Sequence, residues 1–206
     1  MNRQIRGFLP WFLLIGGSVL LFFPEILFLE KGFVSGDHRK QHYSWFYLYS
    51  QEIKHLALPW WTSLNQCGFP LLAEGQVGAF YPLNFIFAFF FPPQWGYNFS
   101  ALFHYFLAGV FFFLYSRKVG MNSKAAFWGV LIFLFGSAQG GFFYNVTSQR
   151  VLTWFPLSLF YIHRLLEKAT WRDALTLGLV FALESIAGYQ QYAVYAIVFA
   201  IFYFLI

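Results

Sequence analysis

Charged residues are scarce in this sequence: Asp, Glu, Lys and Arg make up only 10% of its 206 residues. A water-soluble domain carries roughly a quarter, so too few charges are present to cover a water-facing surface. Cys67 is the single cysteine, which excludes an intramolecular disulfide and a cysteine-based metal cluster. The chain also lacks runs of Lys or Arg, a Gly-rich phosphate loop, a nucleophile elbow and zinc-ligand spacing. These absences argue against nucleic-acid binding and against the corresponding enzyme classes.

Apolar residues are abundant instead, at 59% hydrophobic and 25% aromatic. They form blocks, and a helix that crosses a bilayer needs roughly 20 such residues. We therefore predict an all-α integral membrane protein, one unit over residues 1–206, with about six transmembrane helices. The predicted spans are Phe8 to about Leu29, Tyr97–Tyr115, Ala125–Ser137 (extended by Gln139–Phe143), Val151–Leu166, Ala174–Ala187 and Gln191–Ile206. Because the last block runs to the chain end, we interpret the sequence as the N-terminal part of a longer polypeptide.

Cations in the short loops predict the orientation. Lys and Arg are enriched in cytoplasmic loops of membrane proteins. Placing the N-terminus in the cytoplasm puts most loop cations inside and the cation-poor turn Gly188–Gln191 outside. The inside cations are Arg3, Arg6, Arg117, Lys118, Lys124, Arg164, Lys168 and Arg172.

This orientation makes residues 30–94 a long extracytoplasmic loop. Within it, apolar residues at helical spacing predict an amphipathic helix in the headgroup layer; these are Trp45, Leu48, Tyr49, Ile53 and Leu56. The stretch Phe80–Phe91 is broken by Pro82 and is too short to span, so we expect a re-entrant or interfacial segment. Turns are predicted between these two elements.

Asp37 is the leading candidate for chemistry, since it lies just beyond the first span beside Gly36. Such a carboxylate can act as a general base, or it can hold a divalent cation that neutralises a phosphate leaving group. Arg39 and Lys40 are candidate phosphate contacts. The same charges are also consistent with a solvated loop that pairs its own residues.

Other candidates are spread along the chain. Glu74 and Gln76 lie in a turn-rich segment that can fold over Asp37, and Arg150 at the outer start of a span is either a phosphate contact or an interfacial anchor. Glu184 lies inside a span, where it faces the bundle interior or extends to the interface. His104 is expected to be a hydrogen-bonded residue of the bundle.

An ordered set of short motifs goes beyond composition. It comprises Gly36-Asp37, Leu58-Pro59-Trp60-Trp61, Gly68-Phe69-Pro70-Leu71, Phe80-Tyr81-Pro82-Leu83-Asn84, Trp154-Phe155-Pro156-Leu157 and Ala187-Gly188-Tyr189-Gln190-Gln191. In this order the set resembles the YfhO-type bacterial membrane proteins, which look like members of the GT-C superfamily of glycosyltransferases. The resemblance implies a GT-C-like fold, Asp37 as catalytic base or metal partner, and a role for Gln190 in substrate binding.

The resemblance implies a bacterial inner-membrane enzyme that moves a sugar from a polyprenyl-phosphate-linked donor onto a cell-envelope acceptor. Its partners are then membrane lipids and that donor, with no nucleic acid and no certain cofactor. One alternative is a non-catalytic flippase, transporter or assembly subunit that handles the lipid carrier. Another is an enzyme portion that is inactive without the rest of its polypeptide.

Overall fold

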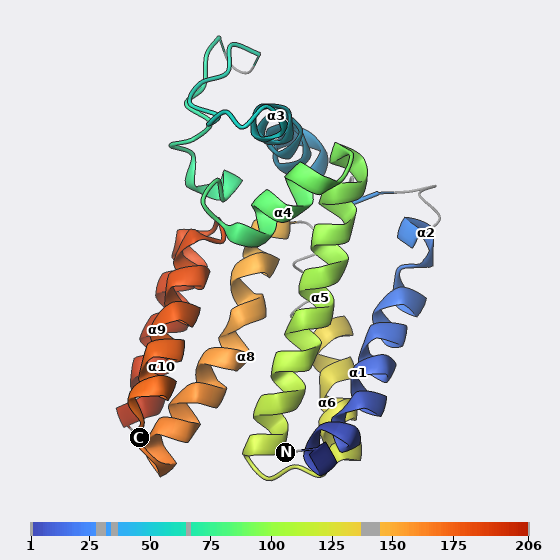
Figure 1. The fold of residues 1–206 in the computed structure, drawn as a ribbon, viewed down its shortest axis with the longest axis vertical. Helices are drawn as coiled ribbons and strands as arrows, with labels where there is room; N and C mark the ends of the chain where they lie inside the picture. Colours follow the sequence, from blue (N-terminus) through green and yellow to red (C-terminus); the bar gives the residue numbers. More distant parts are fainter. Residues whose placement is uncertain (1, 28–31, 34–36, 65–66, 137–144, 206) are drawn as a thin grey trace.

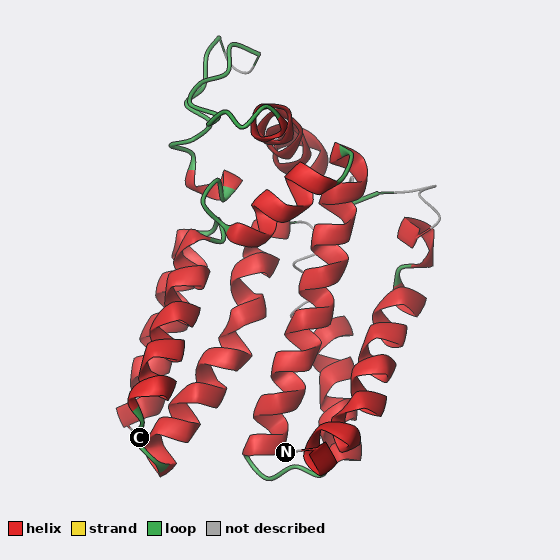
Figure 2. Cartoon of the chain, in the orientation of Figure 1, coloured by secondary structure: helices red, strands yellow, loops and turns green. Residues whose placement is uncertain are grey.

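The computed structural model describes residues 2–27, 32–33, 37–64, 67–136 and 145–205, and over these residues its regular structure is helical (Figures 1 and 2). Six helices lie side by side along the long axis of the molecule, and the two termini lie at the same end (Figure 1). These helices are α1 (Asn2–Phe22), α5 (Pro93–Lys118), α6 (Ser123–Phe135), α8 (Val146–Glu167), α9 (Trp171–Ile186) and α10 (Gln190–Leu205). The all-helical prediction is therefore confirmed.

Among the described helices, α5 is the one both long and apolar enough to cross a membrane. Gly7–Phe22 of α1, together with α6 and α10, are shorter apolar helices. That six helices cross a bilayer thus stays a prediction. The proposed extension of α6 through Gln139–Phe143 falls outside the described residues.

The first predicted span is wrong at its outer end. The helix α1 stops at Phe22, and a separate short helix, α2 (Pro24–Leu27), follows. Proline lacks a backbone N–H and disfavours helical geometry in the residue before it, so Pro24 ends α1 well before Leu29. The start of α8 was also misplaced, since this helix begins at Val146 rather than Val151.

The loop predicted outside the membrane forms a cap over the end of the bundle opposite the termini. Its elements are η1 (His38–His42), α3 (Tyr43–Lys54), η2 (Gly75–Val77) and α4 (Pro82–Phe90). Helix α3 is seen end-on in Figure 1, so it crosses the bundle, and it packs against α4 and α5. The Phe80–Phe91 stretch is accordingly a short helix that begins with Pro82 at its first turn.

Helix α3 is amphipathic as predicted, although Leu56 lies beyond its end and is exposed; its place in a headgroup layer stays a prediction. Trp45, Tyr49 and Ile53 are buried against Leu71 and Val77 and against residues of α4 and α5. Burying each such side chain contributes about 1.5–3 kcal/mol. The apolar stripe therefore fixes α3 to the rest of the protein.

Two glycines allow the cap to lie directly on the turn between α9 and α10. Gly188 has φ of +126°, and a Cβ placed on it would lie 2.9 Å from the carbonyl oxygen of Gln76. Gly78 has φ of +64°, and a Cβ there would lie 3.2 Å from the Ala187 carbonyl oxygen. Side chains at both positions would force the two backbones apart.

We expect Gly188→Ala to lower the free energy of unfolding by about 1–3 kcal/mol, because alanine is strained at this φ and meets backbone that cannot move aside. The control is Gly178→Ala on an exposed face of α9, where a Cβ meets nothing within 4 Å; there we expect a gain of about 0.5–1 kcal/mol. Unfolding midpoints in detergent measure both. Equal midpoints for the two variants would show that the contact is not tight.

Candidate functional site

The second turn of α8 carries an arginine into the interior beneath the cap. Asn145 starts this helix, because its side-chain oxygen accepts the backbone N–H groups of Thr147 at 3.0 Å and Ser148 at 3.1 Å. The amide of Gln149 donates to the Ala101 carbonyl of α5 at 3.2 Å. Arg150 follows and is only 2% exposed. The prediction of a surface anchor at Arg150 is therefore wrong, since the earlier helix start places this residue inside.

Arg150 lines a small pocket between α8 and the cap. The walls come from His42 of η1, the first turn of α3, Gln76 of η2, and Thr147 beside Arg150 itself. About 10 Å³ is accessible to a water-sized group, which is room for roughly one water molecule or one phosphate oxygen. As it stands, the pocket can receive one corner of an anion but not a whole sugar.

The guanidinium of Arg150 has no hydrogen bond or ion pair with any residue that the structure describes, and its Nε is fully buried. Removing an ionised group from water without a partner costs several kcal/mol. Three tyrosines, Tyr49, Tyr81 and Tyr97, surround this charge electrostatically, but their hydroxyl groups are neutral near pH 7. Among the described residues, no carboxylate forms an ion pair with this buried positive charge.

His42 faces the same pocket as a neutral imidazole. Burial, then the charge of Arg150, then His38, lower the pKa of His42 from 6.5 to about 3. Neither ring nitrogen has a hydrogen-bond partner within the described part of the chain. One nitrogen can therefore donate a hydrogen bond to a ligand oxygen, while the other accepts one. Burial also raises the pKa of Tyr49 to about 12, and its hydroxyl donates to the Ala79 carbonyl at 3.0 Å.

A chain of hydrogen bonds fixes the cap above this pocket. His104 Nδ1 lies 2.6 Å from the Ser100 carbonyl oxygen, which can only accept, so we assign the ring proton to Nδ1. His104 Nε2 then accepts from the Tyr81 hydroxyl at 2.8 Å, and the Tyr81 oxygen accepts from Trp154 Nε1 at 2.9 Å. The prediction that His104 is a hydrogen-bonded bundle residue is confirmed.

The other predicted site residues do not all converge on the pocket. Asp37 is exposed at the start of η1, and its side chain makes no capping hydrogen bond. Lys40 is exposed, and the side chain of Arg39 lies outside what the structure describes. Glu74 is a cap, because its carboxylate accepts the Gln76 backbone N–H at 3.3 Å. Glu74 does not line the pocket, whereas Gln76 does.

Two further candidates lie close to the turn between α9 and α10. The amide of Gln190 covers Gly75, since a Cβ on Gly75 would lie 2.2 Å from its Nε2; this places Gln190 beside Gln76. Glu184 is fully buried, and neither carboxylate oxygen has a hydrogen-bond partner among the described residues. Of the two interpretations of Glu184, the structure supports the one that faces the bundle interior.

Two residues that line the pocket, His42 and Thr147, were not predicted from the sequence. A signal for His42 was present, because residues 42, 45, 46, 49 and 53 share one helical face. His42 therefore extends the apolar stripe by one turn and had to be buried with it. Thr147 carried no comparable signal, since its position depends on where α8 begins.

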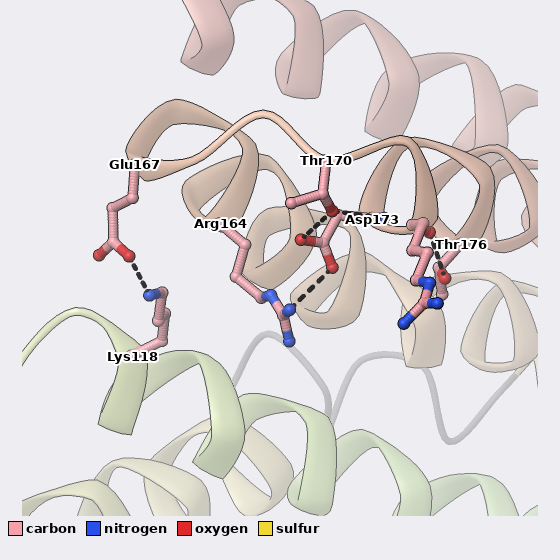
Figure 3. Close-up of polar contacts among 7 residues, drawn as sticks. Lys118, Arg164, Glu167, Thr170, Asp173 and Thr176 are labelled. Atoms are coloured by element: carbon pink, nitrogen blue, oxygen red, sulfur yellow. Dashed lines mark hydrogen bonds and ion pairs between the residues drawn. The ribbon is translucent and has the colours of Figure 1, made fainter.

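At the opposite end of the bundle, some of the described charges form ion pairs. Lys118 forms an ion pair with Glu167, and the Arg164 guanidinium lies 3.0 Å from the Asp173 carboxylate (Figure 3). The Thr170 hydroxyl also donates to Asp173 at 2.8 Å. Arg150 differs from these described charges because it is buried without an ion pair among the described residues.

No group of three or more His, Cys, Asp and Glu side chains among the described residues is arranged to hold a metal ion. A divalent cation beside Asp37 remains a prediction. No protein-family model, curated protein or solved structure matches the chain.

We expect Arg150→Met to raise the free energy of unfolding by about 1–3 kcal/mol, because it removes an unpaired buried charge and keeps most of the side-chain volume. The matched control is Arg164→Met, which leaves the 7% exposed Asp173 carboxylate without its cation. Because Arg164 itself is 45% exposed, we expect a loss of only about 1–2 kcal/mol there. Denaturant unfolding checks both signs, and a loss at Arg150 would mean that its charge is compensated.

His42 should also make stability depend on pH. The folded protein holds its pKa near 3 against 6.5, so the unfolded chain binds the proton more readily. The contribution is complete above about pH 6.5 and is lost toward pH 3, at about 1.4 kcal/mol per pH unit. Unfolding midpoints between pH 7 and 4 should fall more steeply in the parent than in His42→Gln. Parallel curves would contradict a neutral, buried His42.

Proposed function

We propose that the chain is a multi-pass protein of the bacterial inner membrane, with its N-terminus in the cytoplasm and the cap outside. Large apolar side chains are exposed along the bundle helices, as expected where lipid covers them. The cations of the α5–α6 and α8–α9 loops lie at the end that holds the N-terminus (Figure 1), in agreement with the positive-inside rule. Most polar candidates lie at the other end.

We further propose that it is a GT-C-like glycosyltransferase, which moves a sugar from a polyprenyl-phosphate-linked donor to a cell-envelope acceptor. The observation that carries this proposal is the buried, unpaired Arg150 in a pocket at the outer end of the bundle. A lipid phosphate supplies the missing anion, and arginine binds phosphate through charge-assisted hydrogen bonds. His42 and Gln76 offer neutral donors beside it.

Asp37 is the proposed base. It lies five residues before His42, on the order of 7 Å along the helix axis, and its exposed carboxylate is open to an acceptor from outside. The acceptor hydroxyl transfers its proton to Asp37 while its oxygen bonds to the anomeric carbon of the donor sugar. The bond between that carbon and the phosphate oxygen breaks, and the lipid phosphate leaves with the electron pair beside Arg150.

A carrier flippase, transporter or assembly subunit is the second candidate, and Glu184 favours it. A fully buried carboxyl group without a partner, inside an apolar helix, is a feature of proteins that move ions or charged substrates through the bilayer. However, several polar residues gather at the outer end of the bundle, in contrast to the single Glu184 within it. They favour chemistry at the surface.

We expect Asp37→Asn to lower sugar transfer from a labelled polyprenyl-phosphate donor by about 10²–10⁴-fold, since it removes the base. Arg150→Met should lower it by about 10²–10³-fold, since the leaving phosphate loses its stabilising charge. The control is Glu167→Gln, an exposed carboxylate at the opposite end. Sugar transfer is measured in membranes that contain the full-length protein, and membrane insertion is checked for each variant.

The outcomes separate the candidates. Unchanged transfer in Asp37→Asn would assign the base to another residue, and unchanged transfer in Arg150→Met would reject the phosphate site. Absence of transfer in the parent and in every variant would favour the carrier-handling alternative.

A further inference from the structure

A second pocket lies on the other side of α3, away from Arg150. Residues 59–64 and 67–71 run beside each other there as a hairpin: Thr62 and Phe69 exchange backbone hydrogen bonds of 2.9 and 2.8 Å. The Phe69 ring stacks on Trp45 at 5.4 Å with an interplanar angle of 14°. These contacts join the described part of this hairpin to the buried face of α3. The hairpin projects beyond the end of the bundle (Figure 1).

The cavity between α3 and the hairpin measures about 370 Å³, within the range of small-molecule sites. Aromatic and polar groups face one another across it. Tyr47, Gln51 and Glu52 line it from α3, and Trp61, Thr62 and Ser63 line it from the hairpin. Glu52 is the single charged side chain among the described lining residues.

Trp61 forms a fixed platform at this cavity. Its indole lies directly over Gly68, which has φ of +130°; a Cβ there would lie 2.4 Å from Trp61 Cζ2. The close approach therefore depends on glycine at position 68. Although held in this way, Trp61 remains 63% exposed, and Tyr47 is 46% exposed. Trp61 is thus offered to a ligand with little side-chain entropy left to lose, and Tyr47 is exposed at the same cavity.

We propose that this pocket binds a saccharide with no negative charge. A sugar ring presents an apolar C–H face that packs on an indole, and hydroxyl groups around its rim that match Gln51, Glu52, Thr62 and Ser63. The Glu52 carboxylate accepts such hydroxyl groups strongly and repels phosphate-bearing ligands. That the saccharide is the acceptor of glycosyl transfer rests on the proposed function; binding itself does not.

Saturation-transfer NMR tests binding with the full-length protein in lipid nanodiscs and with maltotriose, chitotriose and lactose as probes. We expect signal from the ring C–H protons of at least one sugar in the parent. Trp61→Ala should lower it at least tenfold. The matched control is Trp60→Ala, because Trp60 is 67% exposed but does not line the cavity; its signal should stay within twofold of the parent.

A second pair of variants keeps the test independent of hairpin folding. Gln51→Ala and Glu52→Gln lie on the surface of α3, and each should weaken sugar binding about threefold or more. Absence of saturation transfer to all three sugars overturns the proposal, and so does an equal loss in Trp60→Ala and Trp61→Ala. Quenching of Trp61 fluorescence by brominated lipids, measured as the difference between parent and Trp61→Phe, would place the pocket in the bilayer and also overturn it. Since the donor is absent from these measurements, the proposal and the glycosyltransferase assignment fail separately.

Discussion

The hydrogen bonds from Trp154 through Tyr81 to His104 join three segments far apart in the sequence, and the position of the whole cap depends on them. Tyr81 immediately precedes α4, so its hydroxyl anchors this helix to α5 and α8 at once. One turn later, the Asn84 side chain donates to the Val77 carbonyl at 2.8 Å. This hydrogen bond holds η2 against α4 and thereby places Gln76 beside Arg150.

The surroundings of low polarity stabilise the hydrogen bonds between Trp154, Tyr81 and His104, but they destabilise the charge of Arg150. Buried hydrogen bonds gain strength where water is excluded, whereas an unpaired buried charge loses its hydration without compensation. In the Tyr81 chain, His104 uses both ring nitrogens, and Tyr81 accepts and donates. Arg150, close by, has no partner among the described residues. Because Arg150 carries a charge, its burial without a partner among the described residues supports the proposed phosphate site.

The spacing of apolar residues and the positions of turn-forming residues predicted the helices but not where the helices begin and end. Over the residues that the structure describes, each of the six apolar blocks is largely helical, and three of the five residues in the amphipathic pattern, Trp45, Tyr49 and Ile53, are buried in α3. Pro24 itself indicates the break after Phe22, but the apolar residues on both sides of it favour one continuous span. The start of α8 was harder, since polar residues Thr147 to Arg150 resemble a loop in sequence. They are helical because Asn145 caps them and because Gln149 finds a carbonyl on α5.

The candidate site shows the same limit more sharply. Arg150 and Gln76 were identified by residue type, and Gln190 by the family resemblance. Only tertiary packing brings Gln76 onto Arg150 and Gln190 onto Gly75. His42 was not predicted as a site residue because no sequence motif around it indicates a site. Its helical position, in contrast, does indicate that it is buried. No local pattern could show that Arg150 lacks a counter-ion, since that depends on every segment packed around it.

Helix α3 separates two pockets of different chemistry. Trp45 lines the Arg150 pocket on one side and stacks on Phe69 of the hairpin on the other, so a single buried side chain connects the supports of both. Under the proposed function, the positive charge of Arg150 selects phosphate in the inner pocket, and the Glu52 carboxylate repels it from the outer one. For a transferase this arrangement has a direct consequence, because an anionic lipid donor and an uncharged acceptor do not compete for the same place. In the proposed mechanism, Asp37, which precedes the helix that both pockets share, serves the hydroxyl group that arrives from outside.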